Sequence, residues 1–186
     1  VKDGIHVNDA VVIGGGILNI TATDDGIQWE KGPISVTGGR TTVITTGNAV
    51  YEDSDISSSS CINSGTTFAM TAGTVLLKSS GSAGKGLNCD GEIYLYGGTL
   101  RVVTTGKQYV YGRLDSSAKG IKSKSSLTIE SGTIWVRATG GEGSEGIESR
   151  NVMTINGGDI AVYAYDDCLN ASNNITINGG SVYCYS

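Results

Sequence analysis

The sequence has 186 residues, of which 29 are glycine and only one is proline, and its formal net charge is -5. This acidic balance argues against nonspecific nucleic-acid binding, because proteins that bind nucleic acid in this way present a dominant basic face. No apolar run reaches the length of about 18 residues that a membrane-spanning helix needs, so we expect no membrane span.

One pattern is repeated along the whole chain. Each copy has a short Gly-Ile type element, then an apolar-x-apolar segment that ends at a pair of small turn residues, and then a second alternating segment. The last turn glycines of the seven copies are Gly16, Gly39, Gly73, Gly98, Gly132, Gly158 and Gly180. A repeat of roughly 22 to 26 residues predicts a solenoid, in which each unit buries its apolar face against its neighbours.

Within each copy, apolar and polar residues alternate with a period of two. Leu127 and Ile129, then Ile134 and Val136, are the apolar positions of one copy, and this alternation is typical of strands with one buried face. No segment has the 3.6-residue stripe of a helix. We therefore expect an all-β fold, a single-stranded right-handed parallel β-helix of about seven coils with two inserted loops. It should form one domain over residues 1–186, as a fragment or processed part of a longer chain.

Stacking of the coils should align equivalent apolar residues into interior columns. One predicted column contains Ile129, Ile155 and Ile177, and a second contains Ile134, Ile160 and Val182. A leucine-rich repeat is disfavoured because its Leu-x-x-Leu-x-Leu consensus is missing, and a β-propeller blade needs roughly 40 residues.

Two insertions, at residues 46–60 and 106–117, interrupt the regular spacing. The first is acidic and rich in serine, and we expect a solvated loop, with one wall of a binding cleft as the alternative. The second is cationic and aromatic. Their notable residues are Glu52, Asp53 and Asp55 in the first insertion and Lys107, Tyr109, Tyr111 and Arg113 in the second. Loops on a rigid solenoid are a common place for function.

Stacking also brings carboxylates of successive coils together. Neighbours in a column lie about 4.8 Å apart, so Glu145 and Asp167 should be adjacent. Like charges this close repel unless a cation lies between them, and Ca²⁺ prefers clustered oxygen ligands. We expect one Ca²⁺ site at Glu145, Glu148, Asp166 and Asp167, and another at Asp3, Asp24 and Asp25. The alternative is that these acids are solvated turn residues flanked by Lys119.

Cationic and aromatic residues at outward positions predict a sugar-binding surface. Aromatic faces stack on the apolar face of a sugar, while cations and hydrogen-bonding groups hold its edges. The candidates are Lys85, Lys119 and Lys122 in the Gly-Ile element, and Arg101, Trp135, Arg137 and Tyr183 in the later strand. The alternative is that strands recruit aromatic residues for packing alone.

The four cysteines do not form a Cys-x-x-Cys motif, which disfavours a zinc site. Cys184 takes the inward position that Val136 and Val162 hold in earlier coils, so we expect a small core residue. A disulfide from Cys184 to Cys168, across one coil, is the alternative.

Three segments carry a resemblance to a known family. They are Ala118-Lys119-Gly120-Ile121, the run from Gly140 to Glu148, and Asp166-Asp167-Cys168-Leu169-Asn170, placed between Ile-Asn-Gly-Gly type strands. The sequence resembles the β-helical carbohydrate-binding domain family of secreted and surface proteins in gut Bacteroidales and clostridia. The resemblance implies an extracellular or cell-surface location, calcium binding, and a shape like that of pectate-lyase-type enzymes. Cys168 departs from the usual Asp-Asp-Gly-Ile turn, which puts the geometry of that turn in question.

Three functions remain open. The resemblance and the surface columns favour a noncatalytic, calcium-stabilised domain that binds cellulose or an acidic polysaccharide such as polygalacturonate. The alternative is a polysaccharide lyase, in which Lys119 abstracts the proton next to a uronate carboxylate that Ca²⁺ neutralises. A structural stalk or adhesin is the third. Nucleophilic catalysis is disfavoured because His6 is the only histidine.

Overall fold

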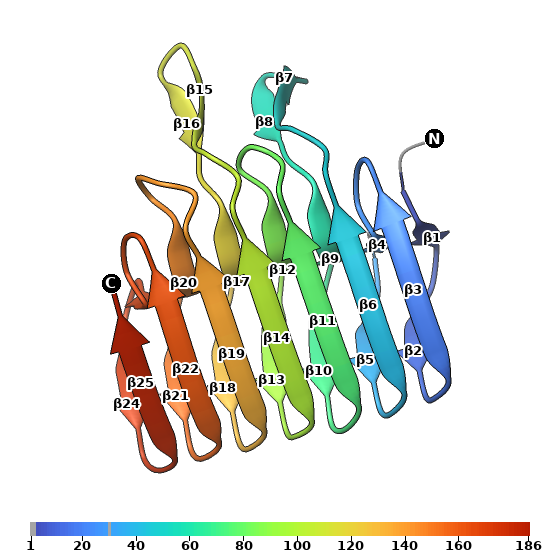
Figure 1. Ribbon diagram of the computed structural model, residues 1–186, viewed down its shortest axis with the longest axis vertical. Coiled ribbons are helices and arrows are strands. Elements are labelled where there is room, and N and C mark those ends of the chain that lie inside the picture. The colour runs from blue at the N-terminus through green and yellow to red at the C-terminus, as the bar shows by residue number, and fades with distance from the viewer. Residues whose placement is uncertain (1–2, 30) are drawn as a thin grey trace.

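A computed structural model describes residues 3–29 and 31–186 of the chain (Figure 1). It contains three parallel sheets of seven strands each, and no helix occurs among the described residues. Equivalent strands of successive coils lie side by side along the whole molecule (Figure 1). The predicted parallel β-helix of about seven coils is therefore confirmed. None of the described residues forms a helix able to cross a membrane.

Each coil contributes one strand to each of the three sheets. Sheet A contains β1 (Ile5–Val7), β4 (Ile27–Trp29), β9 (Ser60–Ser64), β12 (Lys85–Cys89), β17 (Lys119–Ser123), β20 (Glu145–Ser149) and β23 (Leu169–Ala171). Sheet B contains β2 (Val11–Ile13), β5 (Ile34–Val36), β10 (Thr67–Met70), β13 (Glu92–Leu95), β18 (Leu127–Ile129), β21 (Met153–Ile155) and β24 (Ile175–Ile177). Sheet C contains β3 (Ile17–Ala22), β6 (Arg40–Thr45), β11 (Thr74–Ser79), β14 (Thr99–Thr104), β19 (Thr133–Ala138), β22 (Asp159–Ala164) and β25 (Ser181–Tyr185).

The core is a stack of columns that run through the coils. Ile129 pairs with Ile155, and Ile155 pairs with Ile177, as predicted. The second predicted column, Ile134, Ile160 and Val182, is also in register. Ile155 is fully buried, whereas Ile177 is 54% exposed because it lies in the last coil of the stack. Each coil therefore depends on its neighbours to cover its apolar face.

The turns between sheets B and C explain the recurring second glycine. Gly98 has a φ of 86° and Gly132 a φ of 107°, a backbone conformation that residues other than glycine rarely adopt. The same turns stack closely, because a Cβ atom added to Gly132 would lie only 2.8 Å from the carbonyl oxygen of Gly98. The repeat thus needs glycine there for both backbone angle and space.

Both insertions contain a two-stranded antiparallel hairpin. The first hairpin pairs β7 (Val50–Glu52) with β8 (Asp55–Ser57), and the second pairs β15 (Tyr109–Tyr111) with β16 (Leu114–Ser116). Asp53 and Ser54 both have positive φ, which gives the tight turn that suits a two-residue hairpin loop. Each hairpin projects from the connection between a sheet C strand and the next sheet A strand, and the two lie side by side at the top of Figure 1. The expected loops are therefore ordered arms rather than irregular segments.

Candidate functional site

A cleft of about 590 Å³ lies over sheet A, and both hairpins contribute to its walls. Asp55 and Ile56 come from β8, and Asp115 and Ser116 come from β16. Its cations are Lys85, Lys119, Lys122, Lys124 and Arg150. Its acids are Asp55, Asp115, Glu145 and Glu148. Of the three acids of the first insertion, Asp55 lines this cleft, whereas Glu52 and Asp53 are not among its lining residues. That the cleft binds a ligand stays a prediction.

Parallel stacking places the charged residues of the cleft floor in two columns. Lys85 pairs with Lys119, which pairs with Glu145, and a second column contains Asn88, Lys122 and Glu148. Adjacent coils are one strand spacing apart, so side chains of a column are close enough to interact. The regular repeat therefore converts one position in the sequence into a continuous charged surface.

Lys119 lies between two carboxylates of the next coil. Its Nζ atom is 3.0 Å from Oε1 of Glu145 and 3.6 Å from Oε2 of Glu148, and it also donates a hydrogen bond of 2.8 Å to the Gly143 carbonyl. Lys122 approaches Glu148 to 3.3 Å, and Arg150 approaches it to 3.7 Å. Burial raises the pKa of Glu145, and the hydrogen bond and charge of Lys119 oppose that rise. These lysines are therefore already engaged with acids of the chain.

Lys85 is in a different environment. It is only 8% exposed and forms no ion pair with a carboxylate among the residues that the structure describes. Its ammonium group donates hydrogen bonds to Oγ of Ser58 and, at 3.1 Å, to the Ala83 carbonyl. Burial, and then the charges of Lys122 and Lys119, lower the pKa of Lys85 to about 8. The charges of Asp25 and Glu148 act in the opposite direction but do not outweigh these effects. Lys85 is thus a buried cation of the cleft with no direct ion-pair partner among the described residues.

The predicted calcium ligands of the last coils lie close together, with an amine among them. Asn170 donates hydrogen bonds to Glu145 at 3.2 Å and to Asp167 at 3.1 Å, so these two carboxylates are neighbours as predicted. Asp166 is exposed. The Lys119 ammonium group contacts both Glu145 and Glu148, so part of the negative charge of this cluster is offset by the chain itself.

The predicted ligands of the first coils are arranged differently. Asp25 is buried and accepts hydrogen bonds from the Ser60 amide at 2.6 Å and from Asn63 at 2.7 Å. Burial raises the pKa of Asp25 to about 6, although both hydrogen bonds oppose that rise. Oδ2 of Asp3 lies 3.8 Å from the His6 ring, and Asp24 lines a separate cavity of about 210 Å³. No group of three or more His, Cys, Asp or Glu residues is arranged for a metal within residues 3–29 and 31–186. Calcium binding stays a prediction at both sites.

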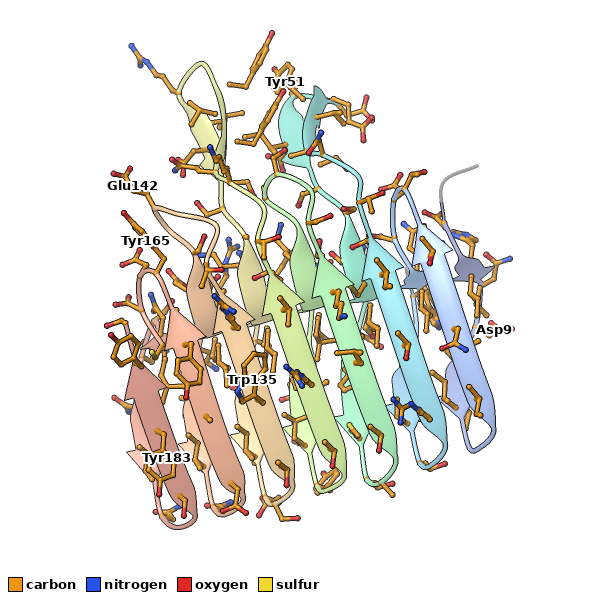
Figure 2. The ribbon with its side chains drawn as sticks, viewed as in Figure 1. Asp9, Tyr51, Trp135, Glu142, Tyr165 and Tyr183 are labelled. Atoms are coloured by element: carbon orange, nitrogen blue, oxygen red, sulfur yellow. The ribbon has the colours of Figure 1, made fainter. Side chains whose placement is uncertain are left out.

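The predicted aromatic candidates lie on sheet C, away from the lysines of sheet A. Arg101 pairs with Trp135 in register, and its guanidinium group lies 4.4 Å from the centre of the Trp135 ring. Tyr163 stands 6.0 Å from Trp135 and 6.1 Å from Tyr185, measured between ring centres. Arg137 pairs with Tyr163, and Tyr183 is 71% exposed. We call Trp135, Tyr163, Tyr183 and Tyr185 the aromatic strip, and Figure 2 shows two of its members, Trp135 and Tyr183, on the sheet of long strands.

The two hairpins touch each other through their tyrosines. The rings of Tyr51 and Tyr111 are stacked, with centres 4.0 Å apart and planes inclined by 14°. Tyr51 lies at the level of the hairpin strands in Figure 2. An aromatic pair contributes roughly 0.5–1.5 kcal/mol beyond the area that it buries. The hairpins therefore form one linked wall above the cleft rather than two independent arms.

We expect Tyr111→Ala to loosen this wall, because the stacked ring of Tyr51 loses its partner. Limited proteolysis should then cleave the second hairpin at Lys107 or Arg113 several-fold faster than in the parent protein. Tyr165→Ala is the matched control, since Tyr165 is an exposed tyrosine outside the hairpins. Equal cleavage rates in the parent and in Tyr111→Ala would show that the stacking does not hold the hairpins together.

Several residues of the cleft were not among the sequence candidates. Arg150 directly follows β20 and lies two positions after Glu148, so continuing the alternation of the strand by one residue would have placed both side chains on one face. Ser58 and Asp115 belong to the insertions, and no repeat fixes where an insertion places its side chains. Their positions depend on how the hairpins fold back over sheet A.

A comparison with protein families gives one match that covers the chain. A family model described as carbohydrate-binding domain-containing protein matches residues 1–108 and again residues 102–186. No curated protein and no solved structure matches the chain. The two matched ranges together span the full length, as expected for a chain built from one repeated unit. The chain belongs to the family of carbohydrate-binding domain-containing proteins.

Proposed function

We propose that this chain binds an acidic polysaccharide without cleaving it, and that the cleft over sheet A holds the acid groups of the sugar. Membership of a carbohydrate-binding family supports the general role. The polar and charged lining of the cleft supports the choice of site and of an acidic ligand. A polysaccharide partner outside the cell agrees with the extracellular or cell-surface location that the resemblance implies.

The observation that carries the proposal is the state of Lys85. Its ammonium group is buried, and the described chain supplies hydrogen-bond acceptors for it but no carboxylate. A buried charge is costly unless an opposite charge compensates it. A uronate carboxylate in the cleft would provide that compensation. Lys119 and Lys122 would add a longer-range attraction, which their own glutamates partly cancel.

A second candidate function rests on the aromatic strip. Tyr183 and Tyr185 are 71% and 72% exposed, and Trp135 adds an indole ring to the same sheet. Exposed aromatic rings stack on the apolar faces of neutral sugars. Sheet C would then bind a neutral glycan such as cellulose, with little dependence on salt. The two surfaces are on different sheets, so variants can separate their contributions.

The two surfaces can be compared in one set of titrations. We expect Lys119→Ala/Lys122→Ala to weaken binding of polygalacturonate, and Trp135→Ala to weaken binding of cellulose fragments only. Binding of a polyanion to the cleft should fall as salt is raised, because salt screens the long-range attraction between the ligand and the cleft cations beyond about 8–10 Å at physiological ionic strength. Undiminished binding of both sugars in both variants would exclude both surfaces.

The lyase alternative is weakened at Lys119 and is better represented by Lys85. A catalytic base needs a pKa close to the working pH. Lys119 is held by two glutamates, whereas the pKa of Lys85 is lowered to about 8. Mixing the protein with polygalacturonate and calcium should give no ultraviolet absorbance from unsaturated uronates. Its appearance would favour a lyase over the noncatalytic function proposed here.

Calcium is part of the proposal as a stabiliser. A ligand that binds only the folded chain raises the melting temperature by mass action, so the melting temperature should rise as Ca²⁺ is added. Glu145→Gln together with Asp167→Asn should remove most of that rise, and Asp3→Asn together with Asp24→Asn tests the other predicted site. Identical melting curves with calcium and with a chelator would exclude calcium as a stabiliser of the fold.

A further inference from the structure

A contact between sheets A and C that recurs in most coils distinguishes two cysteines of the last coil. In five other coils, a glycine at the start of the sheet A strand faces a β-branched residue of sheet C. A Cβ atom added to any of these glycines would lie 2.1–2.3 Å from a side-chain methyl carbon of that residue. The pairs are Gly4 with Ile20, Gly26 with Val43, Gly86 with Val102, Gly120 with Val136 and Gly146 with Val162. In these five coils, any side chain at the glycine position would therefore collide with the β-branched residue opposite it.

The last coil has cysteine at both of these positions. Ile147 pairs with Leu169, which places Cys168 in the glycine column next to Gly146. Cys184 pairs with Val162, which places it in the valine column. Both are free thiols in this structure, Cys168 buried and Cys184 exposed. The glycine–valine contact of the other coils is thus replaced by a cysteine–cysteine contact.

The distance between the two columns is the distance that a disulfide requires. A Cβ atom at Gly86 would lie 3.5 Å from the Cβ atom of Val102. In disulfides the two Cβ atoms are about 3.5–4.5 Å apart. Burial raises the pKa of Cys184, and the neighbouring Cys168 raises it further, so the two thiols are close enough to interact. The two cysteines can therefore be joined without a large movement of the backbone.

Cys61 provides an internal comparison. It occupies the glycine column of the third coil, where the facing position belongs to Leu77. Its sulfur lies 3.5 Å from Oγ1 of Thr45, and burial raises its pKa to about 11. A cysteine in this column is therefore compatible with an ordinary apolar partner. The presence of two cysteines in contact distinguishes the last coil from the third.

We infer that Cys168 and Cys184 can form a disulfide bond within the last coil, which links the residue before β23 in sheet A to β25 in sheet C. A low-molecular-weight disulfide is the oxidant. The thiolate of Cys184, the exposed cysteine, attacks one sulfur of that disulfide and releases a first thiolate. The thiolate of Cys168 then attacks the Cys184 sulfur and releases a second. Two cysteine thiols are oxidised, one disulfide is reduced to two thiols, and the two protons lost from the cysteines pass to the released thiolates.

The bond would restrain the part of the stack that has fewest neighbours. β23, β24 and β25 pair on one side only, with β20, β21 and β22, and terminal repeats of a solenoid open most readily. Closing a loop of about 15 residues removes enough unfolded-chain entropy to lower the population of the open state up to ~100-fold. Amide hydrogen exchange in β23 to β25 should slow by this order on oxidation, and exchange in sheet strands of the middle coils should not change.

Peptide mapping after incubation with oxidised glutathione tests the inference. We expect a linked peptide pair containing Cys168 and Cys184, with Cys61 and Cys89 recovered as free thiols. The matched control is Cys168→Gly/Cys184→Val, which introduces the glycine–valine pair found in four other coils, and its hydrogen exchange should be insensitive to oxidant. Glutathione attached to Cys184 without the internal link, or a linked pair that leaves exchange in β23 to β25 unchanged, would overturn the inference.

Discussion

Replacing Lys85 by Met is expected to weaken binding of polygalacturonate by about 10- to 100-fold. A hydrogen bond to a charged group contributes roughly 1.5–3 kcal/mol, and each 1.4 kcal/mol is tenfold in affinity. Met keeps most of the buried volume, and no carboxylate of the described chain loses an ion-pair partner in this variant. The loss can therefore be assigned to the ligand. Isothermal titration calorimetry at low salt measures this loss of affinity.

The control for Lys85→Met is a lysine substitution outside the cleft. Lys78→Met removes an exposed lysine of β11 on sheet C and should leave affinity unchanged.

Because the pKa of Lys85 is lowered to about 8, the unliganded protein loses this charge as the pH rises through that value. Affinity of the parent should then fall with rising pH, while Lys85→Met should show a flat profile over the same range. Equal affinity of the parent and Lys85→Met would remove Lys85 from the site.

Replacing Ile155 by Ala should lower the free energy of unfolding by roughly 2–5 kcal/mol. Ile155 is fully buried, and it is stacked between Ile129 and Ile177 in one interior column. The shorter side chain leaves a cavity that coils on both sides border, so the surroundings cannot collapse without shifting the stack. Urea denaturation followed by circular dichroism measures the change.

Ile177→Ala is the matched control for this substitution. The residue type and the column are the same, but Ile177 is 54% exposed in the last coil. Much less apolar surface is lost there, so its effect should be well under that of Ile155→Ala. Equal effects of the two substitutions would mean that burial in the column does not determine stability.

The stacked coils could be predicted from the sequence because every coil repeats the same pattern of apolar residues and turn glycines. The alternation around Ile129 and Ile134 predicts which side chains point inward, and the turn glycines set the register between coils. Two of the inferred columns were therefore correct to the residue. The neighbouring carboxylates Glu145 and Asp167 follow from the same stacking.

The cleft was less accessible from the sequence because the insertions do not repeat. Nothing in the run around Tyr51 indicates that its ring meets Tyr111, whose segment begins more than fifty residues later. Lys85 was a candidate through its column, but its burial depends on Ser58 of the first insertion. The lysines and the aromatic candidates Trp135 and Tyr183 were all expected to face sugar, and their separation onto sheets A and C shows that they form two surfaces.

The central claim is that the cleft over sheet A is where an acidic polysaccharide binds. An amine-reactive label, applied with and without oligogalacturonate and read by mass spectrometry, tests it at single lysines. We expect the ligand to protect Lys85, Lys119 and Lys122 from labelling, while labelling of Lys78 on sheet C is unchanged. Ligand binding that leaves the three cleft lysines as reactive as before would contradict it.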